Sequence, residues 1–382
     1  MIHEVIPIRY DATANTAFQR DLKRRVRAYL ATQKNGAKAS AFMWFKVVFY
    51  IAAYLTTLAE LTLVRHSLVV TLALIVVQSM LVVGLAYNVA HDAVHDTLSK
   101  KKWVNELLFY ATFNFFGPNA YLWRHRHIVM HHSAVNVPGF DFNIEAADIL
   151  RFAPTQRWRP MHRYQHLYAP FAYLVFTFHW VFIKDFQMMM LDRIGNVGGI
   201  RHPRWRLAEL VAWKILHVAL LIVLPIFALG VPAWQVIAAY ALFQFLTSVQ
   251  FVLTFTASHL NEGLVFVEAG EENQIPHSFL EHALHTSLDF SPTDPLLSFW
   301  LGGFNSHVAH HMFPAICSVH YPAITRLIQR TAAEHGLPYK QVGFHEVFVN
   351  HFAFLKQMGR DAQSPHAAYM HSAPVASTQT SG

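Results

Sequence analysis

Eight histidines stand in three short stretches of this chain, and their type and spacing suggest metal chemistry. The three stretches are His91-Asp-Ala-Val-His95, His127-Ile-Val-Met-His131-His132 and His307-Val-Ala-His310-His311. Neutral imidazole is the commonest metal ligand that proteins supply. Eight imidazoles exceed the four ligands of one structural zinc site, so they suit two metal ions. The sequence therefore predicts a dinuclear metal site.

The spacing within each stretch predicts that its imidazoles converge. Side chains three or four residues apart lie on one face of a helix. We therefore expect shared faces for His91 with His95, for His127 with His131, and for His307 with His310 and His311, with His132 on the flank. A pH sensor, a structural metal site or an accidental richness in histidine are the alternative interpretations.

The chain has one cysteine, Cys317, which limits the kinds of site that it can build. No disulfide can form within the chain, and a thiolate zinc site or an iron–sulfur cluster is not expected. Ligation by nitrogen alone fits iron, copper, zinc or nickel.

The composition predicts an integral membrane protein. Of the 382 residues, 54% are hydrophobic and only 14% are charged, whereas soluble domains carry about 25% charged residues. The net charge of +7 indicates loops that face anionic lipid rather than nucleic-acid binding. Ionisable groups beside lipid are costly and are usually kept for function. The first forty residues are mixed and polar, and we expect no signal peptide there.

Four apolar segments are near the ~20 residues that a helix needs to cross hydrocarbon. They run over about 45–64, 67–89, 207–229 and 233–257, and short loops join them into two hairpins. Two other apolar stretches, 107–122 and 171–183, are interrupted or too short. We expect those two to form interfacial or buried helices.

Lysine and arginine predict the orientation of the chain. They gather at 23–27, 100–102 and 201–206, whereas the opposite loops carry only Arg65. The positive-inside rule then places both termini and the long central segment in the cytoplasm, so all three histidine stretches face one side. The predicted organisation is a cytosolic segment over 1–40, a membrane domain with a cytosolic cap over 41–360 and a disordered tail over 361–382. The fold class is all-α, with four transmembrane helices and a helical cap that holds the metal site.

At these residues the chain resembles the membrane fatty acid desaturase superfamily, and most closely its linoleoyl-CoA desaturase-type branch. The resemblance runs from His91 to about Tyr339. It rests on His91-Asp-Ala-Val-His95, on Trp123-Arg124 before His127-x-x-x-His131-His132, on Asn136, Gly139 and Asp141, on Arg163-Tyr-Gln-His166-Leu-Tyr168, on His259-Leu-Asn-Glu262-Gly263, on Gly302-Gly-Phe-Asn305, on His310-His-Met-Phe-Pro314, on His320-Tyr-Pro322 and on Gly336-Leu-Pro-Tyr339.

The resemblance implies a mushroom-shaped helical membrane domain whose cytosolic cap holds two non-haem irons. Such enzymes use O2 as co-substrate and remove two hydrogens from a methylene pair of an acyl chain. By motif position the ligands carried over are His91, His95, His127, His131, His132, His310 and His311. His307 is included as a ligand, although front-end members usually have glutamine there. The family usually has asparagine where this chain has Asp289.

Further residues follow from the same resemblance. His259 is the expected ninth ligand and His282 is its rival, while His166 is a candidate for a supporting or cap role. Independently of the resemblance, metal chemistry makes Asp92, Asp96 and Asp141 candidates for orienting the imidazoles through their second N–H groups. Ordinary solvated surface is the alternative interpretation of these acids. The 31 phenylalanines are expected either to contact lipid and fill the core or to line an apolar tunnel for an acyl chain.

The implied partners are a lipid bilayer, an acyl substrate and an electron donor. The acyl group is carried by a lipid, coenzyme A or acyl carrier protein. The chain lacks a His-Pro-Gly-Gly haem segment, so a separate ferredoxin or small cytochrome with its reductase is expected. A bacterial inner membrane is the expected location, and no nucleic acid is expected as a partner.

Two alternative functions remain open at this level. A hydroxylase or an acetylenase would use the same di-iron site on a differently placed substrate. A membrane metal transporter belongs to another class, but transport sites lie near the bilayer midplane, whereas these histidines lie outside the predicted spans.

Overall fold

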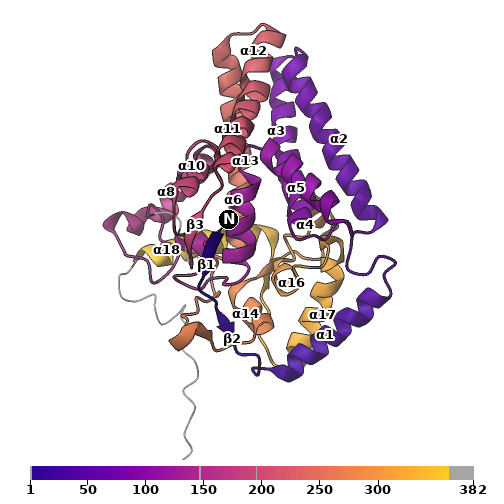
Figure 1. Cartoon of the computed structure of the whole chain (residues 1–382), viewed down its shortest axis with the longest axis vertical. Coiled ribbons are helices and arrows are strands. Elements are labelled where there is room, and N and C mark those ends of the chain that lie inside the picture. The colour runs from indigo at the N-terminus through magenta and orange to yellow at the C-terminus, as the bar shows by residue number, and fades with distance from the viewer. Residues whose placement is uncertain (1, 146–147, 195, 361–382) are drawn as a thin grey trace, which may run out of the picture.

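Two pairs of long apolar helices stand beside each other above a broader helical base (Figure 1). The computed structural model describes residues 2–145, 148–194 and 196–360. The first pair consists of α2 (Ala41–Leu63) and α3 (Leu68–Leu85), which continues through the π-helix η1 (Ala86–Ala90) into α4 (His91–Val94). The second pair consists of α11 (Arg204–Val218), η5 (Ala219–Val223) and α12 (Leu224–Leu229), followed by α13 (Ala233–Ala257). The two pairs touch where α13 packs on α3.

The predicted set of four spans is confirmed as four helices long and apolar enough to cross a membrane, each of 23 to 27 residues. Ser40 and Ser67 begin the first two, because each side chain accepts a hydrogen bond from a backbone N–H three residues later. The second helix runs further than predicted, through Val94. His91 therefore lies on the last turns of this candidate membrane span, within the helix.

The other two apolar stretches form shorter helices. The stretch 107–122 divides into α5 (Lys102–Phe115) and α6 (Ala120–Arg124), and neither is among the candidate spans, as predicted. The stretch 171–183 belongs to a longer run that comprises η3 (Pro160–Tyr164), α8 (Gln165–Leu174), α9 (Phe176–His179), η4 (Trp180–Lys184) and α10 (Asp185–Met190). This run bends by 61° near Val175, with the length and composition of a broken span or a re-entrant loop. The sequence prediction underestimated its length.

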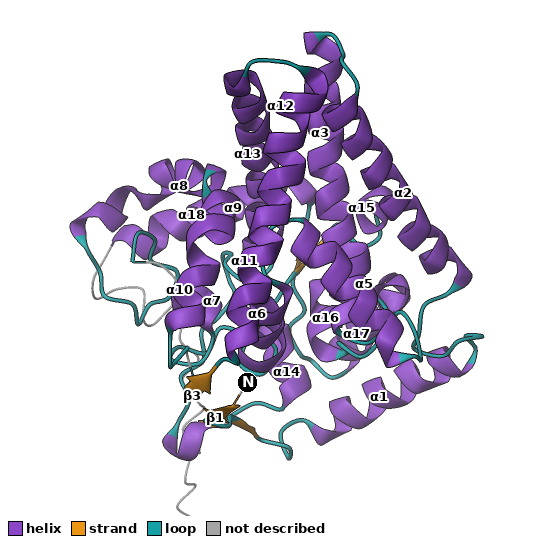
Figure 2. Ribbon diagram, turned by 45° about the horizontal axis from the view of Figure 1, so that its top comes forward, coloured by secondary structure: helices purple, strands orange, loops and turns teal. Residues whose placement is uncertain are grey.

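The base is built from short helices and three small strand pairs (Figure 2). The helices not yet named are α1 (Thr16–Ala31), η2 (His125–His131), α7 (Phe142–Glu145), η6 (Glu271–Asn273), α14 (Phe279–Thr286), α15 (Pro295–Trp300), α16 (His307–Met312), η7 (Ser318–His320), α17 (Tyr321–Glu334) and α18 (Phe344–Arg360). The strands are β1 (Ile2–Val5), β2 (Arg9–Tyr10), β3 (Val197–Arg201), β4 (Gln274–Ile275), β5 (Asp289–Phe290) and β6 (Gln341–Val342). β1 pairs antiparallel with β3, whereas β2 with β4 and β5 with β6 are parallel.

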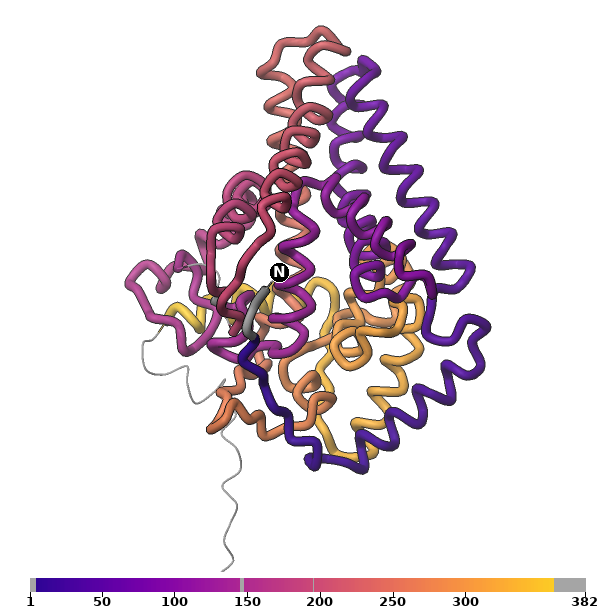
Figure 3. The backbone as a smooth tube through the Cα atoms, viewed as in Figure 1, coloured from indigo at the N-terminus to yellow at the C-terminus, as the bar shows by residue number. Residues whose placement is uncertain are grey.

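The N-terminal and C-terminal parts of the base pack on each other. The indigo helix α1 lies along the yellow-orange helix α17 (Figure 3). Phe18, Leu22 and Val26 of α1 enter the same buried cluster as Ile324 and Ile328 of α17. This cluster also contains residues of α14 and α16, so it fixes the helix that carries the third histidine stretch. The predicted tail, 361–382, lies outside the described residues.

A close backbone approach fixes the segment before α16. Gly302 has a φ of +56°, and a Cβ atom there would lie 2.7 Å from the carbonyl carbon and oxygen of Tyr87 in η1. Only glycine tolerates both the positive φ and the lack of space. The segment that leads to the third histidine stretch therefore lies directly against the helix that leads to the first.

Candidate metal centre

All nine predicted histidines gather in two adjoining groups at the junction of the long apolar helices and the base. The first group consists of His91, His95, His127, His132 and His310, and the second contains His131, His259 and His311. Within each group, one nitrogen of every side chain lies within 4.8 Å of the others. His307 joins the second group, because its Nε2 atom lies 2.7 Å from Nε2 of His259 and 3.1 Å from Nε2 of His311. Eight of the nine side chains are buried, and His95 is partly buried.

The nitrogens of the first group converge on one point. Nε2 of His127 lies 3.1 Å from the Nε2 atoms of three neighbours, His91, His95 and His132. One N–H group can donate a hydrogen bond to only one of these nitrogens, so hydrogen bonds among the imidazoles cannot account for all three short N···N distances. Ligands that sit side by side at about 2.1 Å from one ion are about 3 Å apart. The donor set of the first group therefore fits a metal ion.

The nitrogens of the second group also lie close together. Nε2 of His259 lies 2.7 Å from Nε2 of His307 and 3.0 Å from Nε2 of His311. The ring of His131 lies 4.9 Å from the ring of His259, and its own Nε2 is buried without a hydrogen-bond partner among the described residues. Buried polar atoms rarely stay unpaired, so this nitrogen is available to a cation. The two groups touch, because the rings of His132 and His311 are 4.7 Å apart.

The way in which the histidines divide between the two groups differs from what α-helical spacing predicted. The second stretch lies in the π-helix η2, where the N–H of His132 donates to the carbonyl of His127, five residues earlier. His127 and His132 therefore share a group, and His131 belongs to the other, so the prediction that His127 pairs with His131 was wrong.

The third stretch also divides. His307 and His311 share the second group, as their spacing predicted, but His310 belongs to the first. Neighbouring positions on an α-helix point about 100° apart. Adjacent histidines can therefore serve two different ions.

Three of the rings are oriented through their Nδ1 atoms. His131 contacts Asp141 at 3.2 Å, His310 contacts the Tyr321 hydroxyl at 3.1 Å, and His259 contacts the Thr286 carbonyl at 3.1 Å. Such contacts fix the ring so that Nε2 faces the metal. The sequence predicted the role of Asp141. It assigned no role to Tyr321, which it named only within a motif. No sequence signal marks Thr286, because the contact is made by its backbone carbonyl.

The other two predicted aspartates do not orient imidazoles. Asp92 is buried and accepts hydrogen bonds from the hydroxyl of Ser318 at 2.6 Å and from its backbone N–H at 3.2 Å. Asp96 is exposed and has a φ of +57°. The sequence prediction was therefore wrong for both.

Burial favours the neutral form of eight of the nine clustered imidazoles, because it lowers the pKa of each. It lowers the pKa of His95 and of His259 to about 3, and it lowers the pKa of His127 well below its ordinary value. Neutral imidazole is the form that binds metals. Burial alone would raise the pKa of Asp141, but its interaction with His131 and the hydrogen bonds from the backbone N–H groups of Asn143 and Asn136 hold it below its ordinary value. The Asp141 carboxylate therefore stays ionised beside the second group.

The remaining candidate residues lie elsewhere. Nε2 of His282 lies 2.8 Å from the carbonyl of Val135, and its ring packs edge-on against Tyr10. His166 lies partly buried on α8, near Lys356. Neither belongs to the two groups, so the structure brings His259 and not His282 to the other eight histidines.

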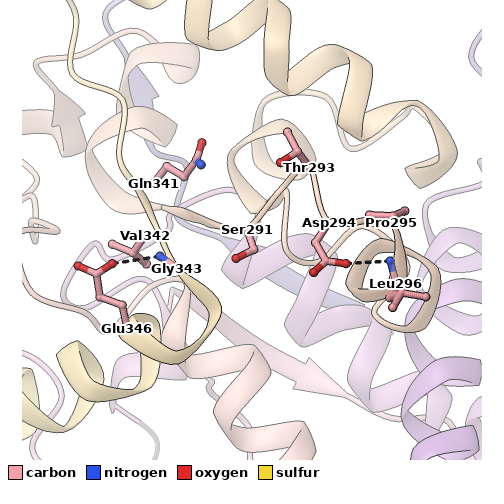
Figure 4. Close-up of a pocket in the computed structure, with 9 residues that line it drawn as sticks. All are labelled: Ser291, Thr293, Asp294, Pro295, Leu296, Gln341, Val342, Gly343 and Glu346. Carbon is pink, nitrogen blue, oxygen red and sulfur yellow. Dashed lines mark hydrogen bonds between the residues drawn. The ribbon is translucent and has the colours of Figure 1, made fainter.

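Two cavities of similar volume lie away from the histidines. One, of 610 Å³, is apolar and lies between the helix pairs, where Leu58, Ile75 and Phe243 line it. The other, of 650 Å³, is polar (Figure 4), and its two carboxylates cap helices or turns. Asp294 accepts from the N–H of Leu296, and Glu346 accepts from the N–H of Gly343. Neither lining includes any of the nine histidines, so the acyl tunnel stays a prediction.

Comparison with known proteins identifies the family. The family described as fatty acid desaturase matches residues 65–343. The chain is 29% identical over 346 residues to an sn-1 linoleoyl-lipid 6-desaturase of Arthrospira platensis, covering 89% of this chain and 92% of that protein. It is 27% identical to an enzyme of the same name from Synechocystis, covering 91% and 97%. It is 26% identical to an acyl-lipid (8-3)-desaturase of Physcomitrium patens, covering 92% and 74%.

The match spans more than half of the chain and includes all nine histidines of the two groups. The four apolar helices accord with a membrane enzyme. The chain therefore belongs to the fatty acid desaturase family and is an oxidoreductase that desaturates fatty acyl chains.

Proposed function

We propose that this chain is a di-iron desaturase that introduces a double bond into the acyl chain of a membrane lipid, with O2 as co-substrate. The observation that carries the proposal is the convergence of nine histidines into two adjoining groups. Iron with O2 supplies the oxidising power that removal of hydrogen from a saturated carbon needs and that acid–base side chains lack.

The residues divide into two proposed ligand sets. The first ion is held by His91, His95, His127, His132 and His310, and the second by His131, His259, His307 and His311. Asp141, Tyr321 and the Thr286 carbonyl orient three of these rings. The buried surroundings exclude bulk water from the reacting carbons.

The membrane arrangement is part of the proposal. The lysine and arginine pattern places both termini and the histidines on the cytoplasmic side of a bacterial inner membrane. Residues 41–360 then form the membrane domain with its cap, between a cytosolic segment over 1–40 and a tail over 361–382. Electrons arrive from a separate ferredoxin or small cytochrome with its reductase.

The proposed substrate is a lipid-linked acyl chain rather than acyl-coenzyme A or an acyl carrier protein. The support is that the three relatives above are named for linoleoyl-lipid or acyl-lipid substrates. The position of the new double bond is left to the experiment, because His307 replaces the glutamine usual in front-end members.

The experiment is expression of the full chain in a host with simple lipids, followed by mass spectrometry that locates new unsaturation in each lipid class. We expect a new double bond, first in membrane lipids, and two irons per purified chain. His310→Ala should abolish the new double bond and lower the bound iron, since it removes a nitrogen of the first group. His335→Ala is the matched control, because His335 is partly exposed and contacts Asp21 on the surface.

Other outcomes would overturn the proposal. A hydroxyl group or a triple bond in the product would make the chain a hydroxylase or an acetylenase. Metal accumulation without any change in lipids would favour a transporter. Full activity with two irons in His310→Ala would contradict the proposed ligand set.

A further inference from the structure

A third group of side chains that could hold a metal ion lies at the start of α14 and on its first turns, apart from the nine histidines. It consists of His277, Glu281 and His285, spaced four residues apart. One ligand atom from each lies within 4.8 Å of the other two. His277 and Glu281 are buried, and His285 is partly exposed.

The contacts around this group leave one oxygen of the Glu281 carboxylate without a hydrogen-bond partner. Oε1 of Glu281 lies 3.9 Å from Nε2 of His285, which is too long for a hydrogen bond. Oε2 of Glu281 is buried and has no hydrogen-bond partner among the described residues. Burying a carboxylate is costly unless it is paired or coordinates a metal. A cation between these side chains would supply the missing interaction.

The alternative is a simple ion pair between Glu281 and a protonated His285. The imidazole rings of His277 and His285 are stacked, with centroids 4.6 Å apart and planes at 24°. Protonation of one ring would place a positive charge against the face of the other and would still leave Oε2 unpaired. Coordination of one ion by both imidazoles and the carboxylate gives Oε2 of Glu281 the partner that it lacks.

This third group is separate from the two histidine groups, but α14 links it to one of them. The neighbouring residue Thr286 offers its carbonyl to Nδ1 of His259. On the side of the N-terminal segment, the N–H of Asp11 donates to the carbonyl of His277 at 3.0 Å, and Asn15 hydrogen-bonds to Glu281. An ion here would fasten the N-terminal segment to the helix that supports His259.

We propose that His277, Glu281 and His285 bind one divalent cation, and that this cation is zinc. Two imidazoles and a carboxylate with one open position form a recurring zinc ligand set. For nitrogen and oxygen ligands, zinc binds more tightly than ferrous iron does. The partly exposed His285 gives the ion access from solvent. The site holds α14 in place and takes no part in the reaction.

The test is metal analysis of the full chain purified in detergent from cells grown with iron and zinc. We expect one zinc per chain in addition to the iron. Glu281→Gln, which keeps the size of the side chain, and His285→Ala should each lose that zinc and leave the iron content unchanged. Titration with Zn²⁺ against a chromophoric chelator should show at least tenfold weaker binding in both variants. His335→Ala again serves as the control, with zinc retained.

The outcomes distinguish this site from the desaturase centre, because zinc and iron are counted separately. Equal zinc content in the wild type and in both variants would overturn the proposal, as would a wild type that binds no zinc. A third iron in place of zinc would overturn the assignment of the metal. If His285→Ala does not elute as a single species in size-exclusion chromatography, Glu281→Gln alone decides.

Discussion

Nδ1 of His131 lies 3.2 Å from Oδ2 of Asp141, and both side chains are almost completely buried. The same carboxylate accepts hydrogen bonds from the backbone N–H groups of Asn136 and Asn143, each at 3.0 Å. Asp141 thereby connects the ring of a proposed ligand to the loop that follows the second histidine stretch. The geometry makes this carboxylate a candidate positioning residue for the second histidine group.

Asp141→Asn is expected to weaken metal binding. The amide keeps the shape of the side chain but removes the charge that fixes the His131 ring. Loss of such a partner typically costs 10- to 100-fold in metal affinity or activity. Iron content and product formation should fall by that order, measured on the purified variant. Asp96→Asn, at an exposed carboxylate, is the control, and an equal loss in both variants would contradict the positioning role.

Lys214→Met is expected to destabilise the protein strongly. Nζ of Lys214 lies 2.6 Å from Oδ2 of Asp185, and both side chains are buried where α11 meets the bent helix run. Removing one partner leaves an uncompensated buried charge, which costs about 3–5 kcal/mol. The thermal midpoint in detergent should fall by several degrees.

The exposed pair of Arg9 and Glu272 supplies the control for this prediction. Glu272→Gln should change the midpoint little, because exposed ion pairs contribute little. A double variant, Lys214→Met with Asp185→Leu, should recover part of the loss. If Lys214→Met has the wild-type midpoint, the buried pair is not important for stability.

Gly302→Ala is expected to prevent normal folding. The added methyl group would overlap the main chain of Tyr87, which cannot move aside as a side chain can. Gly199→Ala is a matched control, since Gly199 also has a positive φ, of +61°, but has no atom within 4 Å of the added carbon. Gly199→Ala should cost only about 1 kcal/mol of backbone strain. Yield and thermal midpoint of the two variants measure the difference, and equal losses would show that crowding is unimportant.

His351 predicts a dependence of stability on pH. Burial lowers its pKa from 6.5 to about 4, so between these values the unfolded chain binds more protons than the folded one. The stability contributed by this group is therefore present above pH 6.5 and is lost as the pH falls towards 4. When this contribution is lost completely, the free energy of unfolding falls by about 3 kcal/mol.

Thermal midpoints between pH 7.5 and 4.5 test this dependence against His351→Gln. Glutamine can still donate to the Leu260 carbonyl and accept from Tyr173, the two partners of His351. The variant should show a weaker decline of the midpoint on acidification. Parallel curves for the wild type and the variant would show that other groups control the acid response.

Much of the fold follows from local sequence. Each of the four long helices needs only a continuous apolar run with a loop at its end, which a single sequence reveals directly. The bend near Val175 was not predicted, because the apolar stretch 171–183 contains no glycine or proline that would mark a break in a helix. The second span was predicted to end before His91, because the π-helical turns of η1 leave no clear mark in hydropathy.

The candidate site was predicted as a set of residues but not as an arrangement. The types and spacing of the histidines identified eight imidazoles, and the resemblance added His259. Support from the Tyr321 hydroxyl and the Thr286 carbonyl went unpredicted, since contacts between distant segments, and above all main-chain contacts, leave no motif.

The sequence by itself determined the family, the four apolar helices and the nine histidines, because each depends on residue type and short-range spacing. Only the tertiary structure decided which imidazoles share a group. His131 and His132 are neighbours in the chain, as are His310 and His311, yet each pair is divided between the two groups. The physical reason is the direction of side chains on a helix, altered in η2 by its π-helical hydrogen bonds, together with the packing that brings α4, η2 and α16 to one place.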